Sequence, residues 1–185
     1  MNRVTAFLGL GSNMGDSVST LMQAVCTLNQ CPSISVVQMS SLIQTSAQGP
    51  DGALITQPDY INGVCQIQTS QSPLELLQTT QQIEIQYGRL SKGDGQSRSL
   101  DIDILLFGDL CVEMSALTIP HRLMHMRDFV LFPMSEIAPD VVHPRVQKTM
   151  QTLRDMYLKC HVSRISNVLD QAHIYASLSV DYNTV

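Results

Sequence analysis

The chain contains no tryptophan, and its aromatic content is only 5%. No stretch approaches the roughly 20 consecutive apolar residues of a membrane-spanning helix, so we expect no membrane span. The five cysteines are widely spaced and include no C-x-x-C pair, which argues against a disulfide scaffold and a zinc site. Yet 44% of the 185 residues are apolar, which excludes intrinsic disorder and suffices for the core of about one domain.

Basic residues are scarce in the first half of the chain. Arg3 is the only lysine or arginine before Arg89, and five of the eleven then lie between Arg89 and Arg127. With a net charge of −5, the chain lacks the broad basic face of a duplex-DNA binder, so we expect no nucleic-acid partner. Cations concentrated in one stretch of an acidic chain favour a local anion site. The short apolar start is unlike a signal peptide, and we expect a cytoplasmic protein.

Hydrophobic periodicity predicts alternating strands and helices. Strands are expected over residues 4–10, 36–45, 60–69 and 100–107, and helices over residues 17–28, 72–87 and 127–137, with one more helix after residue 145. A tight turn at Gly108 is expected to return the chain as a strand over residues 110–112. Asp16 and Ser72 are the expected N-caps, with Glu75 completing a capping box. The order β-α-β-β-α-β predicts an α+β, ferredoxin-like fold, an antiparallel sheet with helices packed on one face.

The strongest chemical signal is the pair of aspartates in Leu100-Asp101-Ile102-Asp103-Ile104. Residues two apart on a strand share a face, so the carboxylates point one way and the apolar side chains fill the opposite, buried face. Two carboxylates this close repel each other unless a cation lies between them, and hard oxygen ligands suit Mg²⁺. The alternative is a solvated strand edge that carries two ordinary surface aspartates.

Cations on both sides of this strand favour the metal interpretation. Arg89, Lys92 and Arg98 precede it in a glycine-bearing loop over residues 88–99, which we expect to be mobile. His121, Arg122, His125 and Arg127 follow it. Such an arrangement is typical of a site where a polyphosphate bridges cations and carboxylates through a metal. Surface cations are usually solvated, but their absence from residues 4–88 favours a cluster with a role.

Three further features leave their alternatives open. Tyr60 and Asn62 share a strand face and suit a flat heterocycle, although a cross-strand packing pair explains them equally well. Gln81 and Glu84 lie one helical turn apart and, taken alone, are expected to be solvated. The glycine-rich turn over residues 9–16 matches neither a dinucleotide fingerprint nor a P-loop, so a structural turn is the favoured interpretation.

Taken in order, these motifs resemble those of the 6-hydroxymethyl-7,8-dihydropterin pyrophosphokinases of folate biosynthesis. The resemblance runs from about residue 7 to residue 144, and its most specific part is Arg98-x-x-Asp101-x-Asp103 followed by Pro120-His121. It implies a ferredoxin-like core with mobile loops over the active site, and pyrophosphate transfer from ATP to the pterin with release of AMP. It also implies a catalytic domain over residues 1–160, which leaves residues 161–185 as a C-terminal extension of unknown role. A monomer is expected, with an oligomer left open.

The resemblance also implies roles for individual residues. Asp101 and Asp103 would hold two Mg²⁺ ions on the triphosphate, and Arg89 and Arg98 would act with them in catalysis. The residues implied in ATP binding are Gln81, Glu84, Arg89, Lys92, Arg98, Ile104, Thr118, His121 and Arg127. Those implied around the pterin are Thr45, Ser46, Tyr60, Asn62 and Phe129.

The chain departs from the family pattern in the loop that closes over the pterin, because well-studied members carry a tryptophan there.

Two other classes of function also fit the aspartate pair. One is a non-catalytic ligand-binding module of the same fold, which predicts nucleotide binding without AMP formation. The other is a D-x-D nucleotidyl- or glycosyltransferase, which predicts a different product and leaves Tyr60 and Asn62 unexplained.

Overall fold

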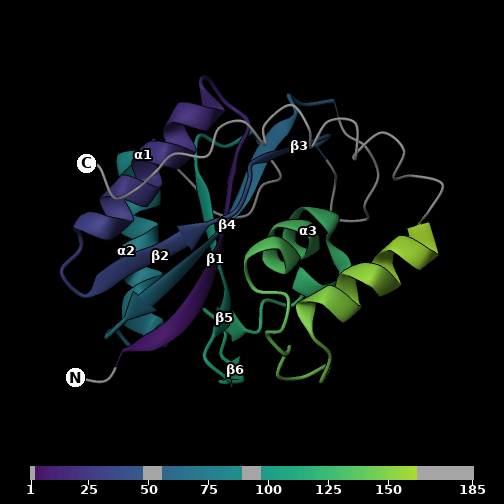
Figure 1. The fold of residues 1–185 in the computed structure, drawn as a ribbon. Helices are drawn as coiled ribbons and strands as arrows, with labels where there is room; N and C mark the ends of the chain where they lie inside the picture. Colours follow the sequence, from purple (N-terminus) through teal and green to yellow (C-terminus); the bar gives the residue numbers. More distant parts are fainter. Residues whose placement is uncertain (1–2, 48–55, 89–96, 162–185) are drawn as a thin grey trace.

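A computed structural model describes residues 3–47, 56–88 and 97–161. Its main sheet is antiparallel, with strand order β2–β4–β1–β5 and β3 paired to β4 (Figure 1). The strands of this sheet are β1 (Val4–Ser12), β2 (Ile34–Met39), β3 (Ile43–Thr45), β4 (Tyr60–Thr69) and β5 (Asp101–Phe107). Helix α1 (Ser17–Gln30) connects β1 to β2, and α2 (Pro73–Gln86) connects β4 to β5. This connectivity confirms the predicted α+β class and ferredoxin-like core.

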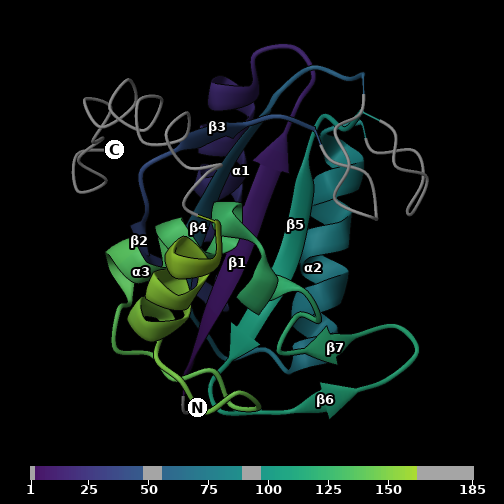
Figure 2. The same cartoon turned by 90° about the vertical axis from the view of Figure 1, so that its right-hand side faces the viewer.

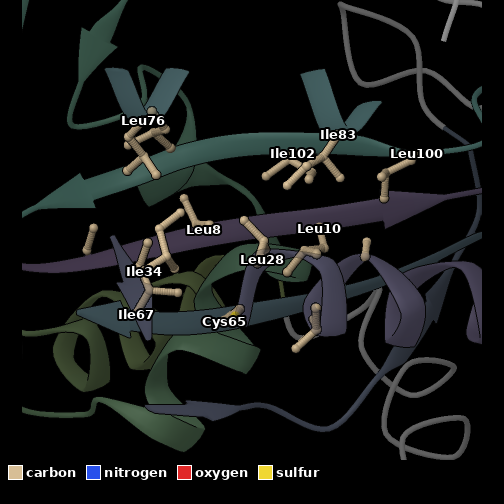
Figure 3. Close-up of a cluster of buried hydrophobic side chains, with 14 of the residues drawn as sticks. Leu8, Leu10, Leu28, Ile34, Cys65, Ile67, Leu76, Ile83, Leu100 and Ile102 are labelled. Carbon is tan, nitrogen blue, oxygen red and sulfur yellow. The ribbon is translucent and has the colours of Figure 1, made fainter. Parts of the chain in front are cut away.

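Helices cover both faces of the sheet, so the prediction of helices on one face is wrong (Figure 1). On one face, α1 and α2 pack around a core made mainly of leucine and isoleucine side chains (Figure 3). On the other face, α3 (Asp128–Ile137) and a helix over residues 150–161 surround a second cluster that includes Leu131 and Met134. Periodicity located both of these helices, but it carries no information on which face a helix covers.

The caps of the first two helices form as predicted. Asp16 Oδ1 accepts the N–H of Ser19 at 3.0 Å. The N–H of Ser72 donates to the Glu75 carboxylate at 2.7 Å, and Pro73 occupies the first turn. A cap of this kind contributes about 1 kcal/mol of stability, so both helix starts are specified locally.

The strand predicted over residues 36–45 is interrupted. β2 and β3 both pair with β4, but residues 40–42 leave the ladder between them. Ser40 Oγ accepts the N–H of Val64 at 2.9 Å, and Leu42 covers Gly63, where an added Cβ would lie 2.9 Å from the leucine side chain. A glycine on the neighbouring strand therefore provides the space that this interruption fills.

The predicted return of the chain beside β5 is also wrong. The residues after the turn form β6 (Val112–Glu113), which pairs with β7 (Thr118–Ile119) in a separate two-stranded sheet (Figure 2). The outer edge of β5 is covered by other groups. The N–H of His121 donates to the Leu105 carbonyl at 3.0 Å, and Glu84 accepts the N–H of Ile102 at 2.8 Å. These hydrogen bonds occupy positions that a further strand would use.

All five cysteines are free thiols; Cys65 is fully buried in the core, whereas Cys26, Cys111 and Cys160 are exposed. Burial raises the pKa of its thiol to about 12. No helix within the described ranges has both the length and the apolar character to cross a membrane. Most of the loop predicted as mobile and residues 162–185 lie outside the described residues, so the domain boundary at residue 160 stays a prediction.

A buried histidine holds the turn between α3 and the last helix. His143 is 2% exposed, and its Nδ1 accepts the N–H groups of Arg145 and Val146, each at 3.2 Å. Burial, reinforced by the neighbouring His125, lowers the pKa of His143 below its ordinary value. The folded chain therefore favours the neutral ring.

Stability is expected to fall as the pH drops below about 6.5, because the unfolded chain then binds a proton at His143 that the folded chain resists. His143→Asn offers a side-chain oxygen to the same two N–H groups but does not titrate, so its stability should depend less on pH. Urea unfolding of both proteins at about pH 7.5 and about pH 5.5 measures the difference. An equal loss of stability in the two proteins would contradict this assignment.

Candidate active site

The candidate site lies on the sheet face that carries α3, where β1 ends and β5 begins. The strand register places Asp101 of β5, Gly11 of β1 and Asn62 of β4 in one row. In the next row on the same face, Gly9 lies between Asp103 and Val64. Because paired residues project to the same side, Asp101 and Asn62 face the same space from two strands that are roughly 10 Å apart.

Gly11 allows two side chains of β4 to approach the backbone of β1 closely. A Cβ added there would lie 3.0 Å from Asn62 Oδ1 and 3.8 Å from a ring carbon of Tyr60. Asn62 is 7% exposed and donates its side-chain Nδ2 to Thr45 Oγ1 at 2.8 Å, which fixes the amide. A side chain larger than hydrogen at this position would therefore displace the rigidly held amide of Asn62 beside Asp101.

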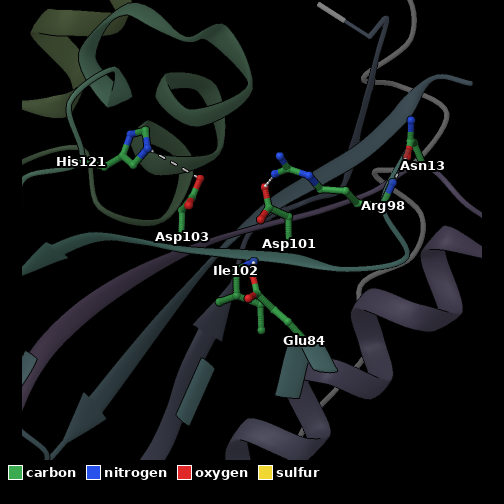
Figure 4. Close-up of polar contacts among 7 residues, drawn as sticks. All are labelled: Asn13, Glu84, Arg98, Asp101, Ile102, Asp103 and His121. Atoms are coloured by element: carbon green, nitrogen blue, oxygen red, sulfur yellow. Dashed lines mark hydrogen bonds and ion pairs between the residues drawn. The ribbon is translucent and has the colours of Figure 1, made fainter. Parts of the chain in front are cut away.

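Each aspartate has a basic neighbour (Figure 4). Arg98 Nη1 lies 2.6 Å from Asp101 Oδ2, and His121 Nε2 lies 3.7 Å from Asp103 Oδ2. The Asp101 side chain is 23% exposed and that of Asp103 is 43% exposed, so both oxygen pairs reach solvent. The prediction that both carboxylates share one face of β5 is confirmed, with Ile102 buried on the opposite face.

The charge states of the two basic groups differ. Burial by itself lowers the pKa of Arg98, but Asp101 outweighs it and the pKa is raised above the ordinary value. Burial lowers the pKa of His121, and Arg127 adds to this effect, although Asp103 opposes it. Because His121 Nδ1 accepts the N–H of Leu123 at 3.3 Å, the proton of the neutral ring is assigned to Nε2. The site therefore combines a permanent cation with a neutral N–H donor.

Two aromatic side chains adjoin this charged centre. Burial raises the pKa of Tyr60, and its phenol also lies in the fields of Arg98 and Asp101. The Arg127 guanidinium lies 5.3 Å from the ring centroid of Phe129. Since Arg127 also acts on His121, it links Phe129 to the histidine side of the site. Aromatic faces and fixed hydrogen-bonding groups together suit a flat, polar heterocycle.

The structure does not bring every implied residue to this face. The side chain of Ile104 is buried on the opposite face, within the cluster formed with α1 and α2. Gln81 is half-buried on α2, which also packs on that face. Thr118 lies on β7 beside β5, and Ser46 is exposed just after β3. Arg89 and Lys92 lie outside the described residues.

Glu84 was expected to be solvated from its position on the helix, and that expectation is wrong. Its side chain is 1% exposed, and its carboxylate reaches the strand between the two aspartates to accept the N–H of Ile102 (Figure 4). The contact ties α2 to the segment that carries the candidate metal ligands. Helical spacing could not reveal this contact, because the partner, Ile102, lies on β5, 18 residues further along the chain.

The donor set fits Mg²⁺ bound together with a phosphate. Among the described residues, no group of three or more histidine, cysteine, aspartate or glutamate side chains is arranged to hold a metal. Asp101 and Asp103 supply two carboxylates, and Mg²⁺ commonly takes one or two of these and completes its shell with phosphate oxygens and water. A site built mainly by the protein, as for structural zinc, is not indicated.

Sequence reasoning missed Asn13, which lies in the turn interpreted as purely structural. Asn13 is 3% exposed, its Oδ1 accepts the N–H of Arg98 at 2.7 Å, and its own N–H donates to the Arg98 carbonyl at 3.0 Å. Its Nδ2 donates to the Pro58 carbonyl at 3.2 Å. Asn13 belongs to the motif Gly11-Ser12-Asn13, which contributes to the family resemblance, but a polar residue directly after a buried strand is too common to indicate a role.

Known proteins resemble the chain at the levels of family, sequence and fold. The family model for 7,8-dihydro-6-hydroxymethylpterin-pyrophosphokinase (HPPK) matches residues 7–139. A Synechocystis protein described as 2-amino-4-hydroxy-6-hydroxymethyldihydropteridine pyrophosphokinase is 43% identical over 145 residues, which cover 78% of this chain and 72% of the relative. A Haemophilus influenzae protein of the same description is 41% identical over 144 residues, which cover 78% and 88%.

The fold is also found in larger proteins. A crystal structure of Plasmodium falciparum HPPK-DHPS with pteroate superimposes with a TM-score of 0.72 at 14% identity. The match covers 93% of this chain and 46% of that one, so this chain spans less than half of the longer protein. At this low identity the likeness shows the fold alone.

The hydrogen bond from Ile102 to Glu84 is expected to contribute to stability. Glu84→Leu, which has a similar volume, leaves a buried N–H without its acceptor and should lower the free energy of unfolding by about 1–3 kcal/mol. Glu84→Gln keeps an acceptor oxygen and should retain most of that stability. Denaturant unfolding in metal-free buffer compares the three proteins. If the leucine variant is as stable as the glutamine variant, this hydrogen bond does not hold the strand.

Proposed function

The chain belongs to the 7,8-dihydro-6-hydroxymethylpterin-pyrophosphokinase family, and on that premise we propose that it transfers pyrophosphate from ATP to 6-hydroxymethyl-7,8-dihydropterin in folate biosynthesis. The products are AMP and the pterin diphosphate. The observation that carries the proposal is the row formed by Asp101, Gly11 and Asn62. In this row a carboxylate suited to the metal-bound triphosphate lies two strands away from an amide suited to the pterin, which supports binding of the two substrates side by side.

We also propose that Asp101 and Asp103 hold two Mg²⁺ ions together with ATP. Their shared face and their exposure to solvent support this role. When bound, Mg²⁺ would neutralise the triphosphate and orient its phosphorus atoms. The protein's own part is to hold the carboxylates rigidly, which β5 does through its pairing with β1 and its hydrogen bond to Glu84.

The basic residues are proposed to bind the triphosphate directly. Arg98 offers a guanidinium whose charge is secured by Asp101, and His121 offers a neutral Nε2–H on the other side of the carboxylate pair. Arg127 adds a third donor beside His121. Donors fixed on several sides of a transferring group can stabilise the charge that develops on it. Gln81, Glu84, Arg89, Lys92, Ile104 and Thr118 complete the proposed ATP set on the resemblance alone.

The pterin is proposed to bind against Tyr60, Asn62 and Phe129. The two rings supply flat apolar surfaces, and the amide of Asn62 is fixed by Thr45. Ser46 completes this proposed set on the resemblance alone. The reaction requires that a pterin bound here direct its hydroxymethyl group toward the carboxylates, of which Asp101 shares a row with Asn62, for attack on the β-phosphorus. Such positioning replaces an encounter of two free molecules by a reaction within one complex.

We propose further that the enzyme acts in the cytoplasm as a monomer, without a nucleic-acid or membrane partner. The acidic charge, and the lack of a membrane-spanning helix in the described ranges, support the latter part of this proposal. Light scattering of the purified protein measures the oligomeric state, and a stable dimer would overturn the assignment as a monomer.

Asp101→Asn is expected to lower turnover at least about a hundredfold, because one of two charged ligands for the metal and triphosphate is lost. The assay incubates the protein with ATP, Mg²⁺ and hydroxymethyldihydropterin and identifies both products by chromatography. Removing Mg²⁺ with a chelator should also abolish turnover in the unaltered protein. Asp109→Asn, in an exposed turn, is the matched control and should retain full activity.

The products distinguish the competing functions. AMP together with the pterin diphosphate supports pyrophosphate transfer. ADP points to transfer of a single phosphate and contradicts the proposal. Nucleotide binding without turnover favours a ligand-binding module, and a nucleotidylated or glycosylated product favours a D-x-D transferase.

Gly11→Ala is expected to raise the KM for the pterin about tenfold, because the new Cβ forces Asn62 aside at a cost of about 1–3 kcal/mol. Gly9→Ala is the matched control, since its Cβ would meet only the flexible end of Leu105, at 3.3 Å. Steady-state kinetics and thermal unfolding of both variants separate an effect on pterin binding from a loss of stability. If both substitutions raise the KM for the pterin equally, the close approach of Asn62 to Gly11 has no special role in binding the pterin.

A further inference from the structure

Asn13 lies where three separate segments of the chain meet. It follows the end of β1, it contacts residues 57–58 just before β4, and it contacts residues 97–98 just before β5. Only 3% of its surface is exposed, and both its side-chain oxygen and its side-chain nitrogen have partners. Since a buried amide is costly unless its hydrogen bonds are made, this arrangement is specific to the side chain present.

On one side, Asn13 fixes the backbone of Arg98 at two points. The Arg98 N–H donates to Asn13 Oδ1 at 2.7 Å, and the Arg98 carbonyl accepts the Asn13 N–H at 3.0 Å (Figure 4). These two bonds fix the backbone from which the Arg98 guanidinium reaches Asp101 at 2.6 Å. Asn13, directly after β1, therefore helps to orient the Arg98 side chain toward Asp101.

On the other side, Asn13 holds the segment that leads to Tyr60. Its Nδ2 donates to the Pro58 carbonyl at 3.2 Å, with Gln57 Oε1 at 3.4 Å and Ser97 Oγ at 3.5 Å as further acceptors. Pro58 stands two residues before Tyr60, whose phenol lies in the fields of Arg98 and Asp101. The side-chain amide of Asn13 thus connects the segment that leads into β4 and Tyr60 with the segment that carries Arg98 and leads into β5.

We propose that Asn13 is a positioning residue that sets the spacing between the pterin and triphosphate halves of the site. Its oxygen serves the triphosphate half through Arg98, and its nitrogen serves the pterin half through Pro58. This inference rests on the proposed function, because it assigns Arg98 and Tyr60 to the two substrates. The glycine-rich turn after β1 then has a role in the reaction although it binds no phosphate itself.

The two ends of the amide can be tested separately. Asn13→Asp keeps an acceptor for the Arg98 N–H but presents an oxygen to the Pro58 carbonyl, so it should raise the KM for the pterin about tenfold and leave the KM for ATP within about twofold. Asn13→Ala removes both contacts and should raise both KM values and lower kcat. Ser12→Ala is the matched control, since Ser12 is also buried at the end of β1 but its hydroxyl donates to Ser17 Oγ.

The measurements are steady-state kinetics for each substrate and thermal unfolding of each variant. A merely structural role predicts that the two Asn13 variants and Ser12→Ala change both KM values only in proportion to their loss of stability. That result, or equal changes in both KM values for Asn13→Asp, overturns the inference. A different result would overturn the proposed function itself: the unaltered protein would form no AMP from ATP and the pterin.

Discussion

The pairing of β1 with β4 on one side and with β5 on the other is the constraint on which the site depends. This register brings Asp101 and Asn62, from distant parts of the chain, into one row with a glycine between them. A shift of one residue in either pairing would turn the carboxylates or the amide into the core, because side chains alternate along a strand. The apolar residues that alternate with the aspartates resist such a shift, since Ile102 and Ile104 are buried against the helices.

The edge of β5 shows how structural and functional demands are met by the same residues. An exposed edge strand has unpaired backbone groups, and here Glu84 and the His121 backbone supply partners for two of them. The Glu84 side chain is thereby fixed between α2 and the strand that carries the aspartates. The backbone contact of His121 brings its side chain to within 3.7 Å of Asp103. Covering the edge therefore also orients groups around the carboxylates.

Much of the site was accessible from local patterns. The alternation in residues 100–104 predicted that both carboxylates share a face, and the spacing of Tyr60 and Asn62 predicted that they share another; the register then shows these to be the same face of the sheet. The concentration of cations from residue 89 onward predicted an anion site; Arg98 contacts Asp101 and Arg127 acts on His121, but the anion site itself stays a prediction. The two predictions of shared faces held because they depend on the geometry of a single strand.

The sequence by itself determined the helices, most strands of the main sheet, the caps of α1 and α2, the carboxylate pair and, through its motifs, the family. Only the tertiary structure decided that helices cover both faces, that β6 leaves β5, that Glu84 is buried and that Asn13 joins three segments. The physical reason is the same in each case. Periodicity and caps report on neighbours within about one turn of helix or a few residues of strand, whereas these features depend on hydrogen bonds and packing between residues far apart in the chain.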